Sequence, residues 1–469
     1  MSAETTAAPA PSSGSAIDNF FKLAERGTSI GTEARAGVTT FMVMADIIFL
    51  NPNILLAGFS QPGVPPNPNF TPVALAAGTA LIAGIMTIAM GAIANYPFAL
   101  AAGLGINAIV AFSLTGRGLS PAGAMGVIVW EGLVVTILVL VGFREAVMNA
   151  VPLALKKAIG VGIGLFILFI GFANGGFVIS NAPATLVTFK LPTTAADFVF
   201  WIGLILTIVL WALKIRAALI ISILVTTVLA LIAGVTKIPT DFAITPSFTT
   251  LGQFDLTQVF SVLPLLTAIT VIYTIMLTDF FDTMGTATGV AAEAGLAKED
   301  GSVPGIGRVL IVDSVAAIAG GLGGVSSNTT YIESAAGVGD GGRTGLASIV
   351  TGVLFLLAIF LSPIAGIIPS VATAPALILV GYLMFTQVKD IDVSNVEDGI
   401  PALLTMILMP LTYDITVGIG AGFISWVLIK VARGKAREIH PLMWVVAILF
   451  LVFFLQGWYL SITQPAPAA

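Results

Sequence analysis

Two stretches decide the fold of this chain: NYPFALAAGLGINAIVAF at 95–112 and GGVSSNTTYIESAAGVGDG at 323–341. Both are interrupted by glycines and are short for a helix that crosses a membrane. Each is the third of seven apolar segments in its half of the chain. Short, interrupted segments in corresponding positions of two halves indicate broken helices around a site at the middle of the membrane.

The composition around these stretches is that of an integral membrane protein. Of the 469 residues, 57% are hydrophobic and 9% are charged, whereas a soluble globular chain carries roughly 25% charged residues. The mean hydropathy is +1.05. Uncharged windows recur at roughly the 20-residue length that an α-helix needs to cross the hydrocarbon core. This pattern excludes a transmembrane β-barrel, whose strands give weak alternating segments.

The apolar segments divide into two sets of seven. They lie near 36–56, 72–93, 98–113, 121–142, 153–173, 197–213 and 216–236, and then, after a polar stretch, near 262–290, 305–323, 326–338, 345–368, 372–388, 400–412 and 413–431. A repeat with an odd number of segments returns in inverted orientation, as is typical of secondary transporters. We predict an all-α polytopic membrane protein of two inverted seven-segment repeats, with 14 transmembrane helices, of which segments 3 and 10 are short and broken.

The positive charges support this topology. With the N-terminus inside, only Arg117, Lys190 and Lys237 fall outside, which leaves 16 of the 19 basic residues in the inside loops. Cytoplasmic loops carry such an excess, so we predict a cytoplasmic N-terminus. Residues 1–18 lack apolar periodicity and a basic region, and we interpret them as a disordered tail and not a signal peptide. Whether the additional apolar segment at 441–463 crosses the membrane stays open.

Several classes of function are disfavoured by what the sequence lacks. There are no cysteines and one histidine, His440, so thiolate, haem and histidine-metal chemistry are poor candidates. The net charge of −5 comes without a basic patch for nucleic acid. The sequence offers no nucleophile–base pair and no nucleotide-binding loop. We therefore expect neither an enzyme nor a resident cofactor.

The ionisable residues inside the apolar segments are all acids. They are Asp46, Glu131, Asp279, Asp282, Asp313, Glu333 and Asp414. An ionisable residue there costs at least about 2.5–3.5 kcal/mol on insertion scales, so it usually faces a cavity or a partner. No lysine or arginine lies in the middle of a segment to pair with them. Proton-coupled transport needs titrating groups of this kind.

Segment eight, with LTDFFDTMGTATG at 277–289, presents a polar face. Asp279, Asp282, Thr286 and Gly289 follow at helical spacing and so lie along one stripe. A single intramembrane aspartate can simply cap or bond a neighbouring backbone. Two on one stripe, opposite a broken helix that has its own glutamate, favour a functional role.

Segment ten places Glu333 after the polar run Asn328, Thr329, Thr330 and Tyr331. A carboxylate beside freed backbone groups suits a planar heterocycle, because it accepts ring N–H bonds while the backbone reads the exocyclic atoms.

For the other candidates, alternatives stay open. Asp313 could brace this site, relay protons or bond a neighbouring helix, and Asp46 and Glu131 are equally open. We interpret Asp414 as a turn or cap residue. Phe98 and Phe281 could stack on an aromatic substrate, although a membrane phenylalanine more often faces lipid or core.

Five motifs carry a resemblance to a known family. They are TTFMVMADIIFLNP (39–52), NYPFALAAGLGINA (95–108), LTDFFDTMGT (277–286), TTYIESAAGVGDGGRTG (329–345) and MPLTYDIT (409–416). In these motifs the chain resembles the nucleobase–cation symporters of the xanthine/uracil permease superfamily, specifically the AzgA-like branch of adenine, guanine and hypoxanthine permeases. The sequence departs from the family pattern at three positions, where Asp46 replaces a tyrosine, Ala102 a proline and Asp414 a small polar residue.

The resemblance implies a core domain of segments 1–4 (36–146) and 8–11 (262–370), and a gate domain of segments 5–7 (150–240) and 12–14 (371–432). It implies proton symport by an elevator-like motion of core against gate, usually in a homodimer. By motif position, Asp282 resembles the acid that contacts the base and Glu333 the acid that holds its ring nitrogens. Asp313 matches a further acid linked to activity, and Phe98 and Asn107 lie in the segment-three motif.

We therefore predict a proton-coupled symporter that imports the purine nucleobases adenine, guanine and hypoxanthine across the plasma membrane by elevator-type alternating access. The predicted substrate-binding residues are Asp282, Glu333, Phe98, Asn107, Phe281, Thr286, Thr330 and Tyr331. The predicted proton-coupling residues are Asp282, Asp313, Glu333 and Asp279. H⁺ is the expected coupling ion, and the expected partners are the purine, membrane lipid and a second copy of the chain.

The same residues leave two other classes of function open. A carrier of the same fold could take xanthine, uracil or a small anion, but an anion would favour a basic residue at the site. A cation channel could use the acids, although broken third segments favour a carrier.

Overall fold

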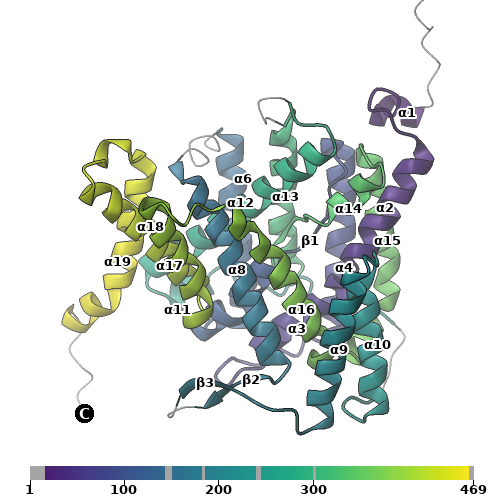
Figure 1. The fold of residues 1–469 in the computed structure, drawn as a ribbon, viewed down its shortest axis with the longest axis horizontal. Coiled ribbons are helices and arrows are strands. Elements are labelled where there is room, and N and C mark those ends of the chain that lie inside the picture. The colour runs from purple at the N-terminus through teal and green to yellow at the C-terminus, as the bar shows by residue number, and fades with distance from the viewer. Residues whose placement is uncertain (1–15, 143–149, 182–184, 239–244, 299–302, 464–469) are drawn as a thin grey trace, which may run out of the picture.

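The computed structural model describes residues 16–142, 150–181, 185–238, 245–298 and 303–463. Most of these residues lie in helices that run roughly parallel or antiparallel to one another (Figure 1). Residues 1–15 of the predicted tail lie outside the described residues, as do the side chains of Phe281 and of residues 456–463.

The first half of the chain runs from α1 to α10. Its elements are α1 (Ala16–Phe21), α2 (Ile30–Met44), α3 (Ile47–Phe59), α4 (Pro72–Ala89), the π-helical turn η1 (Met90–Ala94), β1 (Leu100–Ala102), α5 (Leu104–Ala108), the π-helical turn η2 (Ile109–Leu114), α6 (Pro121–Leu140), α8 (Leu153–Asn174), β2 (Val178–Asn181), β3 (Thr185–Phe189), α9 (Ala195–Ala212) and α10 (Ala218–Ile232).

The second half runs from α11 to α19. Its elements are α11 (Gln258–Val262), α12 (Leu265–Glu293), α13 (Ile306–Leu322), β4 (Asn328–Thr330), α14 (Ser334–Gly339), α15 (Gly345–Ala358), the 3-10 helix η3 (Ile359–Gly366), α16 (Ser370–Phe385), η4 (Thr386–Asp390), α17 (Val396–Thr412), α18 (Ile415–Ala432), η5 (Ala436–Glu438) and α19 (Pro441–Thr463).

Local sequence explains where several helices begin. The hydroxyls of Thr71 and Ser120 cap α4 and α6, and in each helix a proline stands at the first position, where its missing N–H costs nothing. Thr194 and Asp197 form a reciprocal capping box at the start of α9. At the end of η1, Asn95 adopts a left-handed conformation with φ of 54°, which asparagine tolerates better than most residues.

Among the described residues, nine helices are long and apolar enough to cross a membrane. Shorter apolar helices include 104–114 and 218–232. Counted with these, the first half supplies seven segments, and α13, β4–α14 and α17 complete seven in the second half. The broken segments β1–α5 and β4–α14 are the third of each half. The predicted first segment is two helices, α2 and α3, which meet at Asp46.

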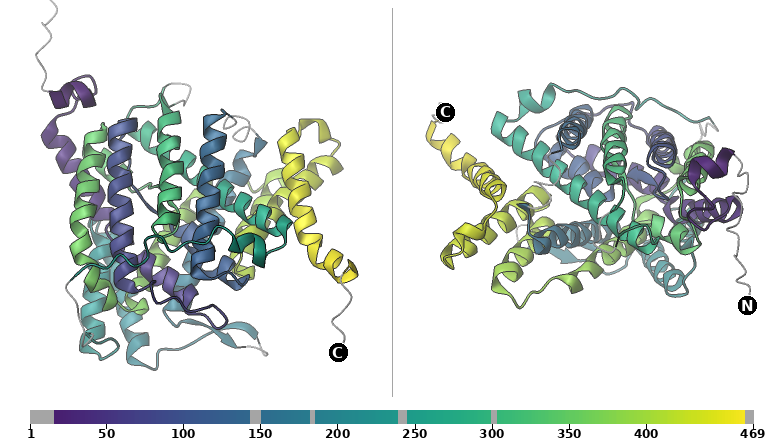
Figure 2. Two further views of the ribbon diagram at one scale, coloured as in Figure 1. Left: turned by 180° about the vertical axis from the view of Figure 1, so that it is seen from behind. Right: turned by 90° about the horizontal axis from the view of Figure 1, so that it is seen from above.

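The helices pack in two groups. The core group contains α2–α6 and α12–α15, with close packing of α6 on α13 and of α15 on α2 and α4. Figure 2 shows α15, α4, α13 and α6 as a row of neighbouring helices on one side of the molecule. The gate group contains α8–α10 and α16–α18, with α8 against α16 and α17. The residue boundaries predicted for the two domains stay a prediction.

The two broken segments meet inside the core group. Strands β1 and β4 pair in antiparallel register, with Leu100 opposite Thr330 and Ala102 opposite Asn328. The N–H of Tyr331 donates to the Ala99 carbonyl at 2.9 Å, and the N–H of Gly103 donates to the Ser327 carbonyl at 2.9 Å. Backbone groups freed by breaking both helices therefore satisfy one another.

Glycine permits a very close helix contact in the core group. A Cβ atom on Gly91 would lie 2.3 Å from the Gly345 carbonyl oxygen, and one on Gly345 would lie 2.0 Å from the Gly91 oxygen. Neither distance is possible for a real side chain, so η1 and the start of α15 require glycine on both sides.

Two features were not predicted from the sequence. Strands β2 and β3 form a hairpin between α8 and α9. In addition, α1 begins at Ala16, within the last three residues of the predicted tail. The additional segment forms α19, which packs on α18 at the edge of the molecule.

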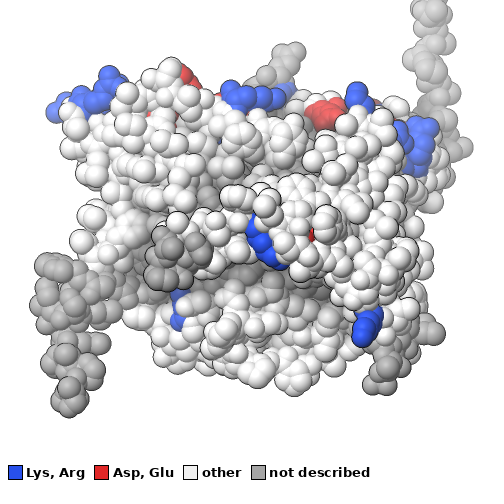
Figure 3. Space-filling model, turned by 60° about the horizontal axis from the view of Figure 1, so that its bottom comes forward, with Lys and Arg blue, Asp and Glu red and all other residues white. Residues whose placement is uncertain are grey.

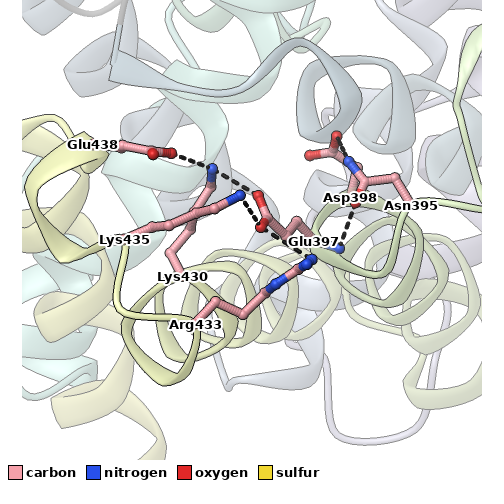
Figure 4. A network of polar contacts seen from close by, with 7 residues as sticks. All are labelled: Asn395, Glu397, Asp398, Lys430, Arg433, Lys435 and Glu438. Carbon is pink, nitrogen blue, oxygen red and sulfur yellow. Dashed lines mark hydrogen bonds and ion pairs between the residues drawn. The ribbon is translucent and has the colours of Figure 1, made fainter.

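In the view of Figure 3, charged side chains gather mainly along one edge of the molecule, and the rest of the visible described surface is largely uncharged. One ionic cluster joins the start of α17 to the end of α18 (Figure 4). The Glu397 carboxylate forms ion pairs with Lys435 at 2.6 Å, Lys430 at 2.8 Å and Arg433 at 3.1 Å. These contacts hold the pKa of Glu397 down at about 2, with the Lys430 and Lys435 bonds as the main causes.

Candidate functional site

Asp313 of α13 braces strand β4 from behind. Its Oδ1 accepts from the N–H of Thr330 at 2.9 Å and from the Thr330 hydroxyl at 2.8 Å. Its Oδ2 accepts from the Thr283 hydroxyl of α12 at 2.7 Å, and Thr283 also bonds Thr329 at 2.7 Å. One buried carboxylate therefore ties α12, α13 and β4 together, which is the bracing alternative considered for this residue.

Three acids gather around the end of β4. Glu333 stands at the N-cap position of α14, half-buried, and makes no capping bond with its side chain. Asp282 of α12 is exposed, and its charge acts on Glu333. Asp46, at the α2–α3 junction, is buried and interacts electrostatically with Glu333. The fold thus brings together acids from segments one, eight and ten. We call this group the substrate acids, after the role predicted for Asp282 and Glu333.

The two predicted polar neighbours of Glu333 are used by the scaffold. The Thr330 hydroxyl donates to Asp313, and the Tyr331 hydroxyl donates to the Ala102 carbonyl of β1. Tyr331 lies within electrostatic reach of Glu333, Asp46 and Asp282. Both residues therefore shape the site, and their hydroxyls are occupied by protein atoms.

The remaining predicted binding residues take different positions. Phe98 is fully buried and stacks on Tyr96 with 4.9 Å between ring centroids, so it packs within the core group. Asn107 of α5 is fully buried, and both polar atoms of its side chain lack a hydrogen-bond partner among the described residues. Thr286 is buried on α12. The side chain of Phe281 lies outside the described residues.

Asp279 is separated from the substrate acids. It is buried on α12, and its carboxyl group interacts with that of Glu131 on α6. The stripe expected from helical spacing therefore divides, with Asp282 toward Glu333 and Asp279 toward Glu131. Three residues are almost one full turn, and a small rotation about the axis is enough to give the two side chains different neighbours.

Asp46 and Glu131 were recognised in the sequence as intramembrane acids but were not placed in the site. Their position inside apolar segments was the available signal. Their partners, Glu333 and Asp279, lie 287 and 148 residues further along the chain, so no local pattern could identify them.

Two inverted seven-segment halves, whose broken third segments pair beside a group of carboxylates, define a secondary transporter. The comparison with protein families agrees, because residues 31–421 match the Permease family of xanthine/uracil permeases. The chain belongs to this family, and it is a transporter and not an enzyme.

Relatives within the family match over nearly the whole chain. The guanine/hypoxanthine permease PbuG of Bacillus subtilis (strain 168) is 42% identical over 447 residues, which cover 94% of this chain and 99% of PbuG. The adenine permease AdeP of Escherichia coli (strain K12) is 38% identical over 439 residues, which cover 93% of this chain and 95% of AdeP.

Solved structures share the fold at low sequence identity. The transmembrane domain of the cyanobacterial bicarbonate transporter BicA is similar with a TM-score of 0.59 at 16% identity, covering 83% of this chain and 96% of that domain. The murine anion transporter Slc26a9 in its inward-facing state gives 0.59 at 12% identity, covering 92% of this chain and 74% of Slc26a9. The predicted fold of two inverted seven-segment repeats is confirmed.

Proposed function

We propose that this permease is a proton-coupled symporter that imports purine nucleobases across the plasma membrane by elevator-type alternating access. The observation that carries the proposal is the meeting of Glu333 and Asp282, from two different elements, beside the β1–β4 pair. Relatives that match over both halves of the chain are a guanine/hypoxanthine permease and an adenine permease. This supports a purine as the cargo.

A purine fits the chemistry of the substrate acids. The Glu333 carboxylate makes no capping bond within α14, so its oxygens are available to accept ring N–H groups of a base. Asp282 is exposed beside it, and Asn107 adds a buried amide that has no hydrogen-bond partner in the described part of the chain. A neutral heterocycle with donors and acceptors on its edge would satisfy these groups together.

Proton coupling follows from the number of acids. Asp46, Asp282 and Glu333 repel one another when ionised, and a base supplies no compensating positive charge. Binding a proton to this group relieves the repulsion and therefore favours binding of the base. The neutralised site then crosses the apolar barrier at lower cost than a charged one.

The packing supports motion of the core group against the gate group. The substrate acids and the β1–β4 pair all belong to the core group, so the site can travel with it. Ion pairs join the groups, Arg216 to Asp340 at 2.6 Å and Arg117 to Asp414. We expect these pairs to break and form during transport. We also expect a cytoplasmic N-terminus and a homodimer.

Two carriers of the same fold are the alternatives. An anion carrier such as the bicarbonate transporter BicA shares the architecture, but three acids at the site of this chain oppose an anion. A xanthine or uracil carrier would differ only in which polar groups of the base it binds. Competition of unlabelled xanthine or uracil with uptake of a labelled purine distinguishes it.

The test is uptake of radiolabelled adenine, guanine, hypoxanthine and uracil into proteoliposomes, with and without an inward proton gradient. Wild type should accumulate a purine only with the gradient, and Glu333→Gln should lose that accumulation. Glu25→Gln is the matched control, because Glu25 is an exposed glutamate paired with Lys22. Uptake that ignores the gradient would refute proton coupling, and the absence of purine uptake in folded protein would refute the cargo.

A further inference from the structure

Glu131 and Asp279 form a second acidic group inside the core group. Their side chains are 0% and 1% exposed. Among the described residues, none donates a hydrogen bond to any of their four carboxylate oxygens. A buried ionised carboxylate without a donor or a counter-charge is strongly unfavourable. The two acids therefore cannot both be charged as they stand.

The two carboxyl groups face each other. Glu131 projects from α6 and Asp279 from α12, two helices that pack together, and the two carboxyl groups interact directly with each other. An ionised carboxylate only accepts hydrogen bonds, so a hydrogen bond between these two groups requires a proton on one member. One proton held between two buried acids is the arrangement that removes the repulsion with the least additional charge.

Among the described residues, the surroundings of the pair supply no counter-charge. The titratable groups that act on the pair are Asp313 from α13 and Asp282 from α12, both acids. No lysine, arginine or histidine forms an ion pair with either member in the described part of the chain. No cluster of three or more acidic, histidine or cysteine residues suited to a metal ion occurs there either. The geometry thus favours a proton over a metal cation.

We propose that Glu131 and Asp279 are a proton-binding site, holding one proton between their carboxyl groups at a place separate from Glu333. The substrate acids gather at the end of β4, whereas this pair lies between α6 and α12. Asp282 acts on Asp279 and on Glu333, so the pair occupies its own position but is electrostatically linked to the purine site.

The pair is connected to the purine site through α12. Asp279 lies one turn before Asp282 and Thr283. Thr283 donates to Asp313 at 2.7 Å, and Asp313 holds Thr330 at 2.8 Å, three residues before Glu333. A change of charge at the pair therefore reaches the substrate acids through one helix and one bracing carboxylate. If the proposed symport is correct, this proton is one of those that move with the purine.

The first experiment needs no transport. Infrared difference spectra of the purified protein, recorded in H₂O and D₂O, should show a protonated carboxyl band that is lost in Glu131→Gln. The new amide would donate to Asp279 and take the place of the shared proton. Asp279→Asn should remove the same band, because one proton serves both acids. The two substitutions lie on different helices. If one variant fails to fold, the spectrum of the other variant still tests the proposal.

Asp414→Asn is the matched control for the spectra. Asp414 is a partly buried aspartate that forms an ion pair with Arg117 and caps α18, so Asp414→Asn leaves the carboxyl groups of Glu131 and Asp279 in place and should leave the band unchanged. An undiminished band in both Glu131→Gln and Asp279→Asn would overturn the proposal. Loss of half of the band in each would mean two protons and would overturn it equally.

The second experiment tests the role in coupling. Exchange of labelled for unlabelled purine across the proteoliposome membrane needs no net proton movement, whereas gradient-driven accumulation does. In Glu131→Gln, the ratio of accumulation to exchange should fall by about tenfold or more. An unchanged ratio would refute the coupling role. Absence of purine exchange in wild type would instead refute the proposed cargo, and the infrared result would still decide the proton site.

Discussion

The guanidinium group of Arg117 forms an ion pair with the carboxylate of Asp414, across the boundary between the core and gate groups. Asp414 also accepts from the N–H of Thr416 at 2.8 Å and so caps α18. The interpretation of this residue as a cap is confirmed. Arg117 lies in addition over the ring of Phe453 on α19, 5.3 Å from its centroid. One loop of the core group is thereby tied to two helices beyond it.

Substitutions at Asp414 should separate these two roles. Asp414→Asn keeps a capping oxygen and loses the ion pair, which at 19% and 16% side-chain exposure is worth about 1 kcal/mol. Asp414→Ala also loses the cap, worth about 1 kcal/mol more. Thermal unfolding in detergent should therefore rank wild type above Asn and Asn above Ala. Equal midpoints for Asn and Ala would contradict the capping role, and Glu25→Gln serves as the exposed control.

Removal of the brace at Asp313 should weaken the purine site without abolishing the fold. Asp313→Asn keeps an acceptor for Thr330 and loses the one for Thr283, whereas Asp313→Ala leaves the buried Thr330 N–H unpaired at a cost of about 1–3 kcal/mol. Purine affinity should fall in that order, by roughly tenfold or more for Ala. Equilibrium binding of a labelled purine measures this. Thr283→Ser, which keeps the hydroxyl, should bind like wild type, and Thr283→Val should not.

The ionic cluster of Glu397 should make stability depend on acid pH. The pKa of Glu397 is lowered to about 2 by the Lys430 and Lys435 bonds, below the unfolded value of about 4.3. The unfolded state thus binds the proton first as pH falls, so the stabilisation is complete above about pH 4.3 and is lost as pH falls toward 2. Unfolding midpoints of wild type and Glu397→Gln should converge across that interval. A constant difference between them would contradict the assignment.

Gly320→Ala should disrupt the approach to β4. A Cβ atom there would lie 1.9 Å from the Ser326 carbonyl oxygen and 2.7 Å from the side-chain amide nitrogen (Nδ2) of Asn328. Overpacking typically costs about 1–3 kcal/mol, and a backbone atom cannot move aside as a side-chain end can. We expect a lower yield of folded protein by size-exclusion chromatography. Gly339→Ala, with no atom within 4 Å of the added Cβ, is the matched control and should fold normally.

The sequence by itself determined the class of the protein and the plan of its fold. The length of the apolar segments and the shortage of charged residues predicted membrane-spanning helices. A segment in lipid must satisfy its own backbone hydrogen bonds, and a helix does so. The glycine-interrupted third segments predicted the two breaks. The apolar setting of Asp282, Asp313 and Glu333 marked them as candidates. All of these are local properties, readable within a window of about 20 residues.

Only the tertiary structure decided which groups meet. Helical spacing put Asp279 and Asp282 on one stripe, yet α6 supplies Glu131 to the first and α14 supplies Glu333 beside the second. Phe98 packs on Tyr96 in the core group, and Arg117 finds Asp414 across 297 residues. Burial, charge neighbours and ion pairs are set by packing between distant segments. Periodicity defines the face that a residue occupies, but not what lies opposite that face.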